Sequence, residues 1–570
     1  MAKKPVNLVY GVDEHPPLGT TLLQGLQHVF IMSVYFIFPV IIIHAVGGNN
    51  AQAATMIQMS MIAMGATTIL QALRKGPIGS GYLAPSGNGP AYLSASLLAG
   101  KTGGISLICG MTIIGGVFEV LFSRLVGRLR ALFPPEVAGL VVTMVGIEII
   151  PLGIERFFGL GDASAGISRN DFLVALITYV SMVGLNTWGK GRLRLYPILI
   201  GMGVGYLSSY LFGILTSAEL GRITAAPLVS FPRFASFGWS FDLMLILPFL
   251  IATLCSSLKD IGDLTTCQKI NDSEWKRSDM KSIGKGIMAD ALGDIFSGVI
   301  GGLGQTSSSS NIGLSLATGA TSRRIAYAAG GLLCLLAFFP KLAEVFVIMP
   351  RPVMGAILIF VTNFMILAGI QIITTRMLDA RKTFVIGTSF ILGVSVFLYP
   401  QAYSQLPPLL HPIFSSALSL ATISVVILNL VFRLGIAKRQ ALTVNPGDRD
   451  ALEKLSIFIQ RQGAAWGARR EVIRLAESAL VEFMEFLAGL KLADGPIEVE
   501  VRYDEMRLDV GFTYQGRLPD FQSQFPSQAD LLEDETAVFR LSSFIIKKSV
   551  DRIKTEEKNG QCHVVFYFDH

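Results

Sequence analysis

Charged residues are scarce in this chain of 570 residues. Asp, Glu, Lys and Arg make up 15% of it, against about 25% in an ordinary soluble domain, while 51% of the residues are hydrophobic. This scarcity argues against a wholly soluble protein. Cysteine is sparse too, since the five cysteines form no CxxC pair and mostly lie in apolar runs. We therefore predict neither a disulfide framework nor a metal site.

The scarcity of charge is confined to the first part of the chain. Residues 1–440 contain 31 Lys and Arg against 19 Asp and Glu, whereas residues 441–570 contain 16 against 22. The first part therefore carries a net charge of +12 and the second a net charge of −6. The sequence predicts a membrane part followed by a soluble tail, and this charge balance gives no reason to expect nucleic acid as a partner.

Apolar runs near the length that crosses a bilayer follow one another from Thr21 to Arg433. We predict an all-α polytopic membrane protein with about fourteen transmembrane spans. The spans are expected to start near residues 21, 51, 90, 104, 136, 171, 196, 241, 284, 304, 324, 353, 383 and 416.

Basic residues support this organisation, because short cytoplasmic loops collect Lys and Arg. With the N-terminus inside, 23 of the 31 basic residues before Ala441 fall in predicted inner segments. Residues 1–20 lack an apolar stretch followed by a small-residue cleavage site, so we predict a cytoplasmic N-terminal segment rather than a secretory signal. We expect a cell inner (cytoplasmic) membrane protein with both termini in the cytoplasm.

Two segments rich in Gly and Ser interrupt predicted spans, namely Gly79–Gly89 and Gly301–Ser310. Non-helical backbone at membrane depth needs protein or a water-filled cavity around it, and paired interruptions point to a transporter's central site. Ser310 and Asn311 are expected to cap and begin the second half-helix. Gln305, Thr306 and the serines of this segment, Ser309 among them, are expected as polar partners for a carbonyl-rich or anionic solute. A pair of ordinary flexible loops is the alternative.

Four separated motifs resemble one known family. They are Gly25–Met32, Ile261-Gly262-Asp263, Met288-Ala289-Asp290, and Asn311-Ile312-Gly313 followed by Thr318-Gly319. In this order they are similar to the nucleobase/ascorbate transporters, also called nucleobase:cation symporter-2 or xanthine/uracil permeases. The resemblance implies two inverted seven-span repeats with broken third and tenth spans. It also implies a core domain (spans 1–4 and 8–11), a gate domain (5–7 and 12–14), a homodimer, and symport with protons or sodium in an elevator-like movement.

The chain departs from the family pattern where the solute is expected to bind. The register of the second motif places Lys259 where members usually have a glutamate, and Ser310 replaces the usual Gln, Glu or Pro. Pro90 replaces the aromatic of the third span, with Tyr82 or Tyr92 as nearby substitutes. The predicted substrate-binding residues are Lys259, Ser310, Asn311, Tyr82, Gln305, Ser309 and Gly313.

Charges inside spans are functional candidates. Lys259 and Asp260 are expected to end the eighth span, while Asp290 and Asp294 stand one turn apart in the ninth. Lys259 has two possible roles: pairing with Asp290 or Asp263, or holding an anionic substrate.

The predicted coupling residues are Asp290, Asp263 and His28. Asp290 is the leading candidate because a carboxylate in a cavity of low dielectric can load and release a proton. A structural hydrogen bond to the broken span is its alternative role. His28 has the alternative of a packed polar residue, and Glu119, Glu148 and Asp171 receive no role.

The tail has the pattern of a small α/β domain. We predict helices over Glu471–Leu490 and Phe544–Lys558, and strands over Ile497–Tyr503, Met506–Tyr514 and His563–Phe568. This order faintly resembles the histidine-kinase-like ATPase fold. The magnesium-binding Asn of that fold has no clear counterpart, and Tyr514-Gln515-Gly516 stands in place of its Asp-x-Gly box. We predict a degenerate regulatory or dimerisation module.

These patterns together predict a secondary active transporter and not an enzyme, with no cofactor. The expected substrate is a purine or pyrimidine base or a related small organic anion such as xanthine or urate. Two alternatives stay open: an anion transporter of the sulfate permease type, and a membrane sensor that recognises a solute and signals through the tail.

Overall fold

The computed structural model divides the chain into two compact units, Met1–Leu430 and Val431–His570. The structure describes residues 3–6, 8–129, 133–160, 167–190, 196–275, 278–374, 378–403, 405–407, 414, 416–433, 435, 438–445, 450–466, 468, 470–504, 507–521, 537–558 and 560–569. The two units are described separately below.

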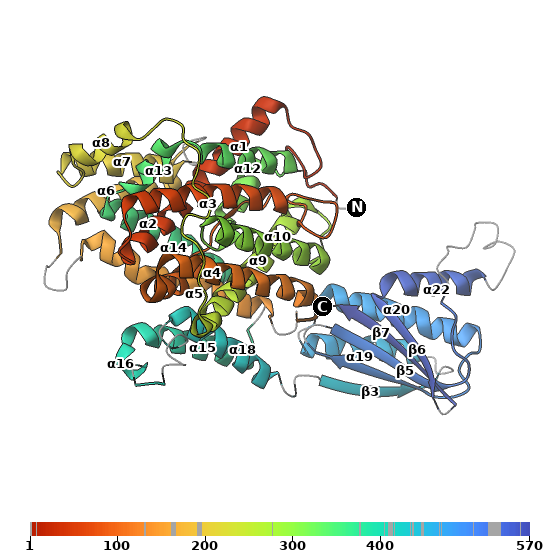
Figure 1. The fold of residues 1–570 in the computed structure, drawn as a ribbon. Helices are drawn as coiled ribbons and strands as arrows, with labels where there is room; N and C mark the ends of the chain where they lie inside the picture. Colours follow the sequence, from red (N-terminus) through yellow and green to blue (C-terminus); the bar gives the residue numbers. More distant parts are fainter. Residues whose placement is uncertain are drawn as a thin grey trace. The chain divides into compact units, whose positions relative to one another are not determined.

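The first unit is almost entirely helical (Figure 1). Its first half contains α1 (Leu18–Met32), η1 (Ser33–Phe36), α2 (Ile37–Ala45), α3 (Asn50–Gln71), β1 (Ser86–Asn88), η2 (Pro90–Tyr92), α4 (Leu93–Leu129), α5 (Pro135–Phe158), α6 (Arg169–Trp188), α7 (Pro197–Leu211) and α8 (Ser217–Ala225). Its second half contains η4 (Leu243–Leu245), α9 (Ile246–Asn271), α10 (Met280–Ile300), β2 (Gln305–Ser307), α11 (Ser309–Thr318), α12 (Arg323–Leu336), α13 (Pro340–Val347), α14 (Arg351–Ile373), α15 (Ala380–Leu398), α16 (Pro400–Tyr403) and α18 (Ala417–Phe432).

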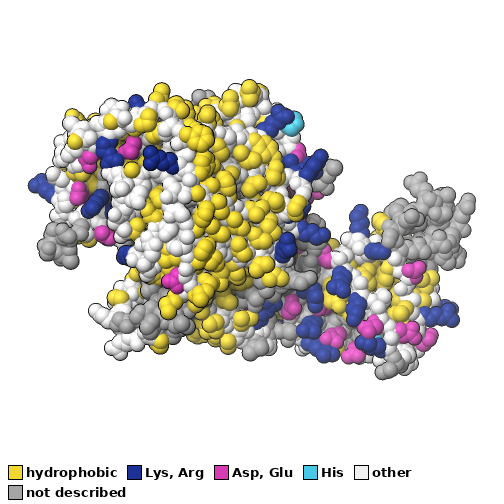
Figure 2. Space-filling view, in the orientation of Figure 1, with side chains coloured by type: hydrophobic (Ala, Val, Ile, Leu, Met, Phe, Trp, Pro, Cys, Tyr) yellow, Lys and Arg dark blue, Asp and Glu magenta, His cyan; other side chains and the backbone are white. Residues whose placement is uncertain are grey.

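Many of these helices are suited to a bilayer. Among the described residues, eight helices are long and apolar enough to cross a membrane, or nine if α12 and α13, bent by 85°, form one span. Helices α7 and α18 are apolar but shorter. Figure 2 shows hydrophobic side chains over the centre of one face of the first unit, with charged side chains toward its margins. The expected polytopic, mostly helical architecture is therefore confirmed.

Breaks within the helices follow residues that cannot continue a regular helix. Gly103 (φ −142°) and Gly104 (φ +75°) leave helical geometry inside α4, so the third and fourth predicted spans meet at this kink. Close helix crossings also depend on glycine: a Cβ atom on Gly65 of α3 would lie 2.6 Å from the carbonyl oxygen of Gly330 in α12. These positions let the backbones approach where larger residues would separate them.

The two interrupted segments come together as a pair of short strands. Strand β1 pairs antiparallel with β2, with Ser86 opposite Ser307, Gly87 opposite Thr306 and Asn88 opposite Gln305. Every residue of both strands is buried. Each strand precedes a helix, and Ser308 is the N-cap of α11. The expectation that Ser310 caps this helix was wrong, because the strand ends two residues earlier than the Ser/Gly pattern suggests.

The second unit is a five-stranded antiparallel sheet with helices over one face. Its elements are β3 (Lys438–Val444), α19 (Ala451–Ala465), α20 (Arg470–Gly489), β4 (Ile497–Tyr503), β5 (Arg507–Gln515), α22 (Ala537–Ser549), β6 (Arg552–Lys558) and β7 (Gln561–Asp569). The strand order is β3-β4-β5-β7-β6. The covered face contributes Val499, Phe512 and Phe566 to a core that Phe483 of α20 enters, 4.6 Å from the Phe512 ring.

Most of the elements predicted for the tail are present. The helix expected over Glu471–Leu490 is α20, and the three expected strands are β4, β5 and β7, although Met506 lies outside the described residues. The helix expected over Phe544–Lys558 was wrong in its second half. Helix α22 ends at Ser549, and residues 552–558 form β6, which pairs with β7 throughout. Pairing with a neighbouring strand outweighed the weak helical pattern of a polar segment.

Candidate functional site

Helix α9 carries Lys259, Asp260 and Asp263 in its middle. The expectation that Lys259 and Asp260 end the eighth span was wrong, because α9 continues to Asn271. The ammonium of Lys259 lies 2.9 Å from a carboxylate oxygen of Asp263, one turn further along, and also donates to the backbone carbonyl of Ser307. The side chains of Lys259 and Asp263 are 8% and 12% exposed. The structure thus pairs Lys259 with Asp263 and not with Asp290.

Asp260 holds the second broken span in place. One of its carboxylate oxygens accepts hydrogen bonds from the amide of Ser307 (2.8 Å), the hydroxyl of Ser307 (2.6 Å) and the hydroxyl of Thr306 (3.1 Å). The Ser307 hydroxyl also lies 2.6 Å from Asp263. Because Asp260 is fully buried, these bonds replace the water that a carboxylate otherwise requires.

The two acidic residues of α10 bind the strand pair from the other side. Asp290 accepts hydrogen bonds from the hydroxyl of Ser86 in β1 and from the amide of Gln71 in α3, both at 2.9 Å. Asp294 accepts one from the Tyr92 hydroxyl at 2.5 Å and another from the backbone amide of Gln305 in β2. Three buried carboxylates therefore hold the crossing of the broken spans. The alternative role of Asp290 was a hydrogen bond to the backbone of a broken span, whereas the structure gives it the side chains of Ser86 and Gln71 as partners.

His28 belongs to a separate chain of hydrogen bonds behind the strands. Its Nδ1 atom lies 2.8 Å from the side-chain oxygen of Asn311, and the Asn311 amide donates to the Ser308 hydroxyl at 2.8 Å. Tyr35 donates to the same hydroxyl at 3.0 Å. His28 and Asn311 are fully buried, so this chain ties α1 to the start of α11.

A cavity of about 350 Å³ opens beside the Lys259–Asp263 pair. This volume lies at the lower end of the range of about 300–1,000 Å³ for small-ligand sites. The lining comes from α5, α9, α11 and α14, and consists of Val142, Lys259, Gly262, Asp263, Thr266, Ile270, Ser309, Ile312, Gly313, Leu316, Ala368, Gln371 and Ile372. A charged pair thus lies in a mainly apolar wall, with hydroxyl and amide groups around it.

Four of the residues proposed from the sequence line this cavity: Lys259, Asp263, Ser309 and Gly313. Ser309 also donates a hydrogen bond to Asp263 at 2.8 Å, so its hydroxyl is part of the same polar group.

The other proposed residues lie elsewhere. Asn311 and Gln305 are buried behind the cavity, Gln305 donating to Asn88 at 3.1 Å, and Ser310 is exposed at the start of α11. Tyr82 packs against an apolar cluster that includes Ile312. Asp290 and His28 are not among the lining residues.

Sequence reasoning gave no binding role to two polar residues that the fold brings into the site, Thr266 and Gln371, whereas Ser307 was expected among the polar serines of the second interrupted segment. Thr266 and Gln371 line the cavity, and Ser307 connects Asp260 to Asp263. Thr266 follows the Ile261-Gly262-Asp263 motif by about one turn, so it could have been predicted from the residues that share a helix face with Asp263. Gln371 stands on α14 with no pattern around it to indicate a site.

The donor groups of this site do not suggest a metal. Within the described part of the chain, no group of three or more His, Cys, Asp or Glu side chains is arranged to hold a metal ion. The carboxylate oxygens of Asp263 are instead occupied by Lys259, Ser307 and Ser309.

Comparison with known proteins agrees with this geometry. The sequence model of the xanthine/uracil permeases, described as a permease family, matches residues 19–402. The chain belongs to the nucleobase/ascorbate transporter family. The resemblance inferred from the four motifs is thus confirmed, and a permease rather than an enzyme is indicated. The family match ends before Val431, so the second unit lies outside it.

Several bacterial permeases are similar over most of their length. A Clostridium perfringens protein named as a purine permease is 31% identical over 429 residues, which cover 75% of this chain and 94% of that protein. The xanthine permease XanQ of Escherichia coli is 27% identical over 461 residues, covering 78% and 98%. The nucleobase transporter PlUacP of Paenibacillus larvae is 26% identical over 427 residues, covering 73% and 96%.

Solved structures share the fold of this permease at low identity. The murine Slc26a9 anion transporter in its inward-facing state has a TM-score of 0.51 and 11% identity, covering 76% of this chain and 71% of that one. A second SLC26A9 structure has a TM-score of 0.50 and 11% identity, covering 75% and 68%. At such identity the likeness concerns the fold alone.

Proposed function

We propose that this permease is a secondary active transporter of a purine or pyrimidine base or of a related small organic anion such as xanthine or urate. The observation that carries the proposal is the Lys259–Asp263 pair in the wall of the cavity beside the broken tenth span. The xanthine, purine and nucleobase permeases that resemble the chain support the same substrate class.

The chemistry of the pair suits an oxopurine. The ammonium of Lys259 donates hydrogen bonds and carries positive charge, so it can bind a carbonyl oxygen or an ionised ring nitrogen. The carboxylate of Asp263 can accept from a ring N–H. Ser309, at the start of α11, adds a hydroxyl near the partial positive charge of the helix N-terminus. A xanthine or urate anion can therefore compete with Asp263 for Lys259, whereas a neutral base gains less.

Ion coupling is part of the proposal, with Asp290 as the coupling group. Asp290 is fully buried and binds Ser86 in the first broken span, so a change in its protonation would alter the hold on β1. Proton or sodium coupling, the fourteen spans in two inverted repeats, the core and gate domains, the homodimer and the cytoplasmic termini are carried over from the family resemblance. The second unit is proposed as a cytoplasmic regulatory or dimerisation module.

Uptake into proteoliposomes tests the proposal. Purified protein is reconstituted and offered radiolabelled xanthine, with urate, uracil, ascorbate and simple dicarboxylates as competitors, under imposed proton or sodium gradients. We expect concentrative uptake of xanthine and competition by urate above competition by uracil. Failure of every nucleobase both to bind and to accumulate would contradict the proposal.

Anion transport of the sulfate permease type is the second candidate, favoured by the cation in the wall of the cavity. Radiolabelled sulfate and bicarbonate are the matching arms of the same uptake assay. Sensing through the tail is tested by deleting Val431–His570. Uptake that survives the deletion favours plain transport, whereas a tail-dependent transcriptional response without flux favours a sensor.

A further inference from the structure

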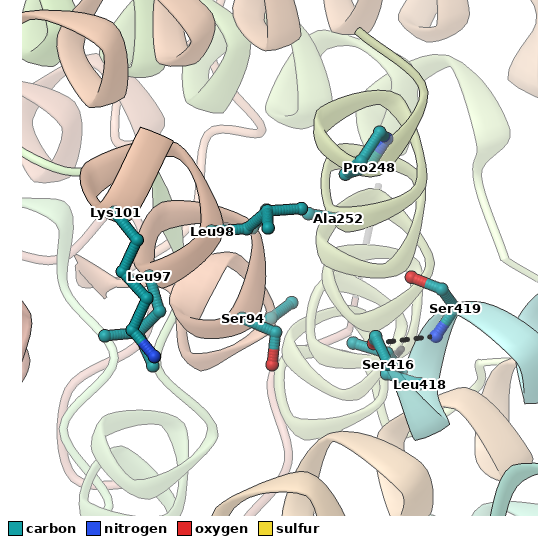
Figure 3. Close-up of a pocket in the computed structure, with 11 residues that line it drawn as sticks. Ser94, Leu97, Leu98, Lys101, Pro248, Ala252, Ser416, Leu418 and Ser419 are labelled. Carbon is teal, nitrogen blue, oxygen red and sulfur yellow. Dashed lines mark hydrogen bonds between the residues drawn. The ribbon is translucent and has the colours of Figure 1, made fainter. Parts of the chain in front are cut away.

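A second cavity lies at the other end of α9 from Lys259. It has a volume of about 240 Å³ and lies between α4, α9 and α18 (Figure 3). The lining residues are Ala91, Ser94, Ala95, Leu97, Leu98, Lys101, Pro248, Ala252, Ser416, Leu418 and Ser419. On α9, this cavity ends at Ala252 and the cavity with Lys259 begins two turns later, about 10 Å along the helix axis.

A packed layer separates the two cavities. Cys255 of α9 and Thr422 of α18 meet there, with the sulfur 3.2 Å from the hydroxyl oxygen, and both residues are fully buried. The cavity beyond Ala252 reaches the surface at the exposed Lys101, and the cavity of Lys259 does so at the exposed Thr266 and Gln371. On α9, a solute that passed from one cavity to the other would have to cross this layer.

Glu148 of α5 connects the elements around the second cavity. One of its carboxylate oxygens accepts a hydrogen bond from the hydroxyl of Ser94 in the first turn of α4, at 2.5 Å. The other accepts one from the backbone amide of Leu418 in the first turn of α18, at 2.7 Å. Figure 3 shows Ser94 and Leu418 on different helices that face the same space.

These two bonds have different physical origins. A helix begins with amide groups that lack partners inside the helix, and a carboxylate beside them is favourable. The bond to Leu418 is therefore a helix cap, supported by the Ser416 hydroxyl, which accepts from the Ser419 amide at 3.2 Å. The bond to Ser94 caps nothing, and it ties the helix after the first broken span to α5.

We propose that Glu148 is a positioning residue that keeps the layer between the two cavities closed by tying α4 to α5 and α18. This inference rests on the proposed transport function, because it assigns both cavities to one solute path. In the core and gate division, Ser94 moves with the core while Glu148 and Leu418 stay with the gate. Movement between the two domains then breaks the Ser94 bond and leaves the helix cap intact. A charged hydrogen bond that is either made or lost favours two discrete arrangements over a continuum.

Cysteine labelling at both cavities tests this inference without any solute. Ser419→Cys reports the second cavity and Thr266→Cys reports the cavity of Lys259, each in protein held in lipid nanodiscs and labelled with N-ethylmaleimide. Peptide-resolved mass spectrometry distinguishes these sites from the five native cysteines. The variants are Ser94→Ala, which removes the tie alone, Glu148→Ala, and Glu148→Gln, whose amide can still accept from Leu418 and donate to Ser94.

We expect Ser94→Ala and Glu148→Ala to speed labelling at position 419 about tenfold and to slow it at position 266. Tenfold is the change in an equilibrium constant expected when one charged hydrogen bond is lost. Glu148→Gln should stay within about twofold of the parent at both positions. Ser96→Ala is the matched control, because the Ser96 hydroxyl has no hydrogen-bond partner among the described residues. It should change neither rate.

An unchanged rate at position 419 would overturn the inference. So would a rise at both positions, which indicates general loosening, and a rise at 419 without a fall at 266, which indicates local fraying of α18. Because labelling needs no substrate, its outcome is independent of whether a nucleobase proves to be the solute. Ser94→Ala keeps the test decisive if Glu148→Ala fails to fold.

Discussion

Carboxylates have opposite roles in the two units of this permease. In the first unit, Asp260, Asp290 and Asp294 are fully buried and accept hydrogen bonds from the strands of the broken spans or from residues beside them. In the second unit, Glu500 and Glu556 lie on strands at the open face of a sheet and pair with Arg439 and Lys554. Both groups are carboxylates, but only those of the first unit hold the backbone of the broken spans in place.

The carboxylates of the two units differ in their exposure to water. Hydrogen bonds from Lys558 and Lys554 lower the pKa of Glu556 to about 2. Yet the lysine side chains are 64% and 53% exposed, and water screens such pairs so that they add little to stability. Removing either a buried carboxylate or its partners costs about 3–5 kcal/mol of stability, because the group that remains is buried without a partner. Four substitutions test this contrast.

Asp290→Asn is expected to have the largest effect, the loss of accumulation against a gradient with solute binding retained. Asparagine can still accept a hydrogen bond from Ser86 or Gln71, but it cannot exchange a proton. The measurement is concentrative uptake beside equilibrium binding. Asp294→Asn, one turn along α10, is the matched control and should keep accumulation. Undiminished uptake by Asp290→Asn would remove it from the coupling mechanism.

Asp260→Ala should destabilise the first unit by about 3 kcal/mol or more, because the Ser307 amide and the Thr306 hydroxyl lose their acceptor in a dry site and the Ser307 hydroxyl keeps only Asp263. Thermal unfolding of detergent-purified protein measures the change. Asp260→Asn, which keeps one acceptor oxygen, should recover part of the loss. Equal unfolding temperatures for parent and Asp260→Ala would show that the crossing does not depend on this clamp.

Lys259→Glu should shift substrate preference toward neutral bases by about tenfold, since the charge in the cavity is reversed and a glutamate accepts where the ammonium donated. Competition of xanthine, urate and uracil for the bound tracer measures the shift. Lys259→Arg keeps the charge and is the control. An unchanged competition profile would rule out direct contact between Lys259 and the solute.

Arg439→Ala should change stability least, by less than about 1 kcal/mol, although its guanidinium lies 2.5 Å from Glu500. The arginine side chain is 70% exposed, so the pair is solvated in both states. Chemical unfolding followed at Trp466 fluorescence reports the second unit. A loss as large as that of Asp260→Ala would contradict the contrast between the units.

Local patterns were enough to find the parts of the site. The Gly/Ser-rich segments identified both broken spans, and the spacing of Asp290 and Asp294 placed them one turn apart on α10. The Ile261-Gly262-Asp263 register placed Lys259 one turn before Asp263 on α9. Each of these inferences depends only on neighbours within a few residues, which is the range over which composition and helical periodicity act.

Long-range partners were outside that range. Pairing of Ser86 with Ser307 and the approach of Gln371 to the cavity each join distant parts of the chain. Residues 552–558 became a strand only because β7 lies beside them. No local signal marks such partners, since the energy of each contact appears only after the helices have packed.

The sequence by itself determined that residues 21–440 form a membrane part, where two spans break, and which family the permease belongs to. It could do so because hydrophobic runs, glycine clusters and short motifs act locally. Tertiary structure alone decided which carboxylates hold the crossing and which residues surround the cavity beside Lys259. The physical reason is burial: once water is excluded, each charge must find its partners among whatever groups the packing brings within about 3 Å.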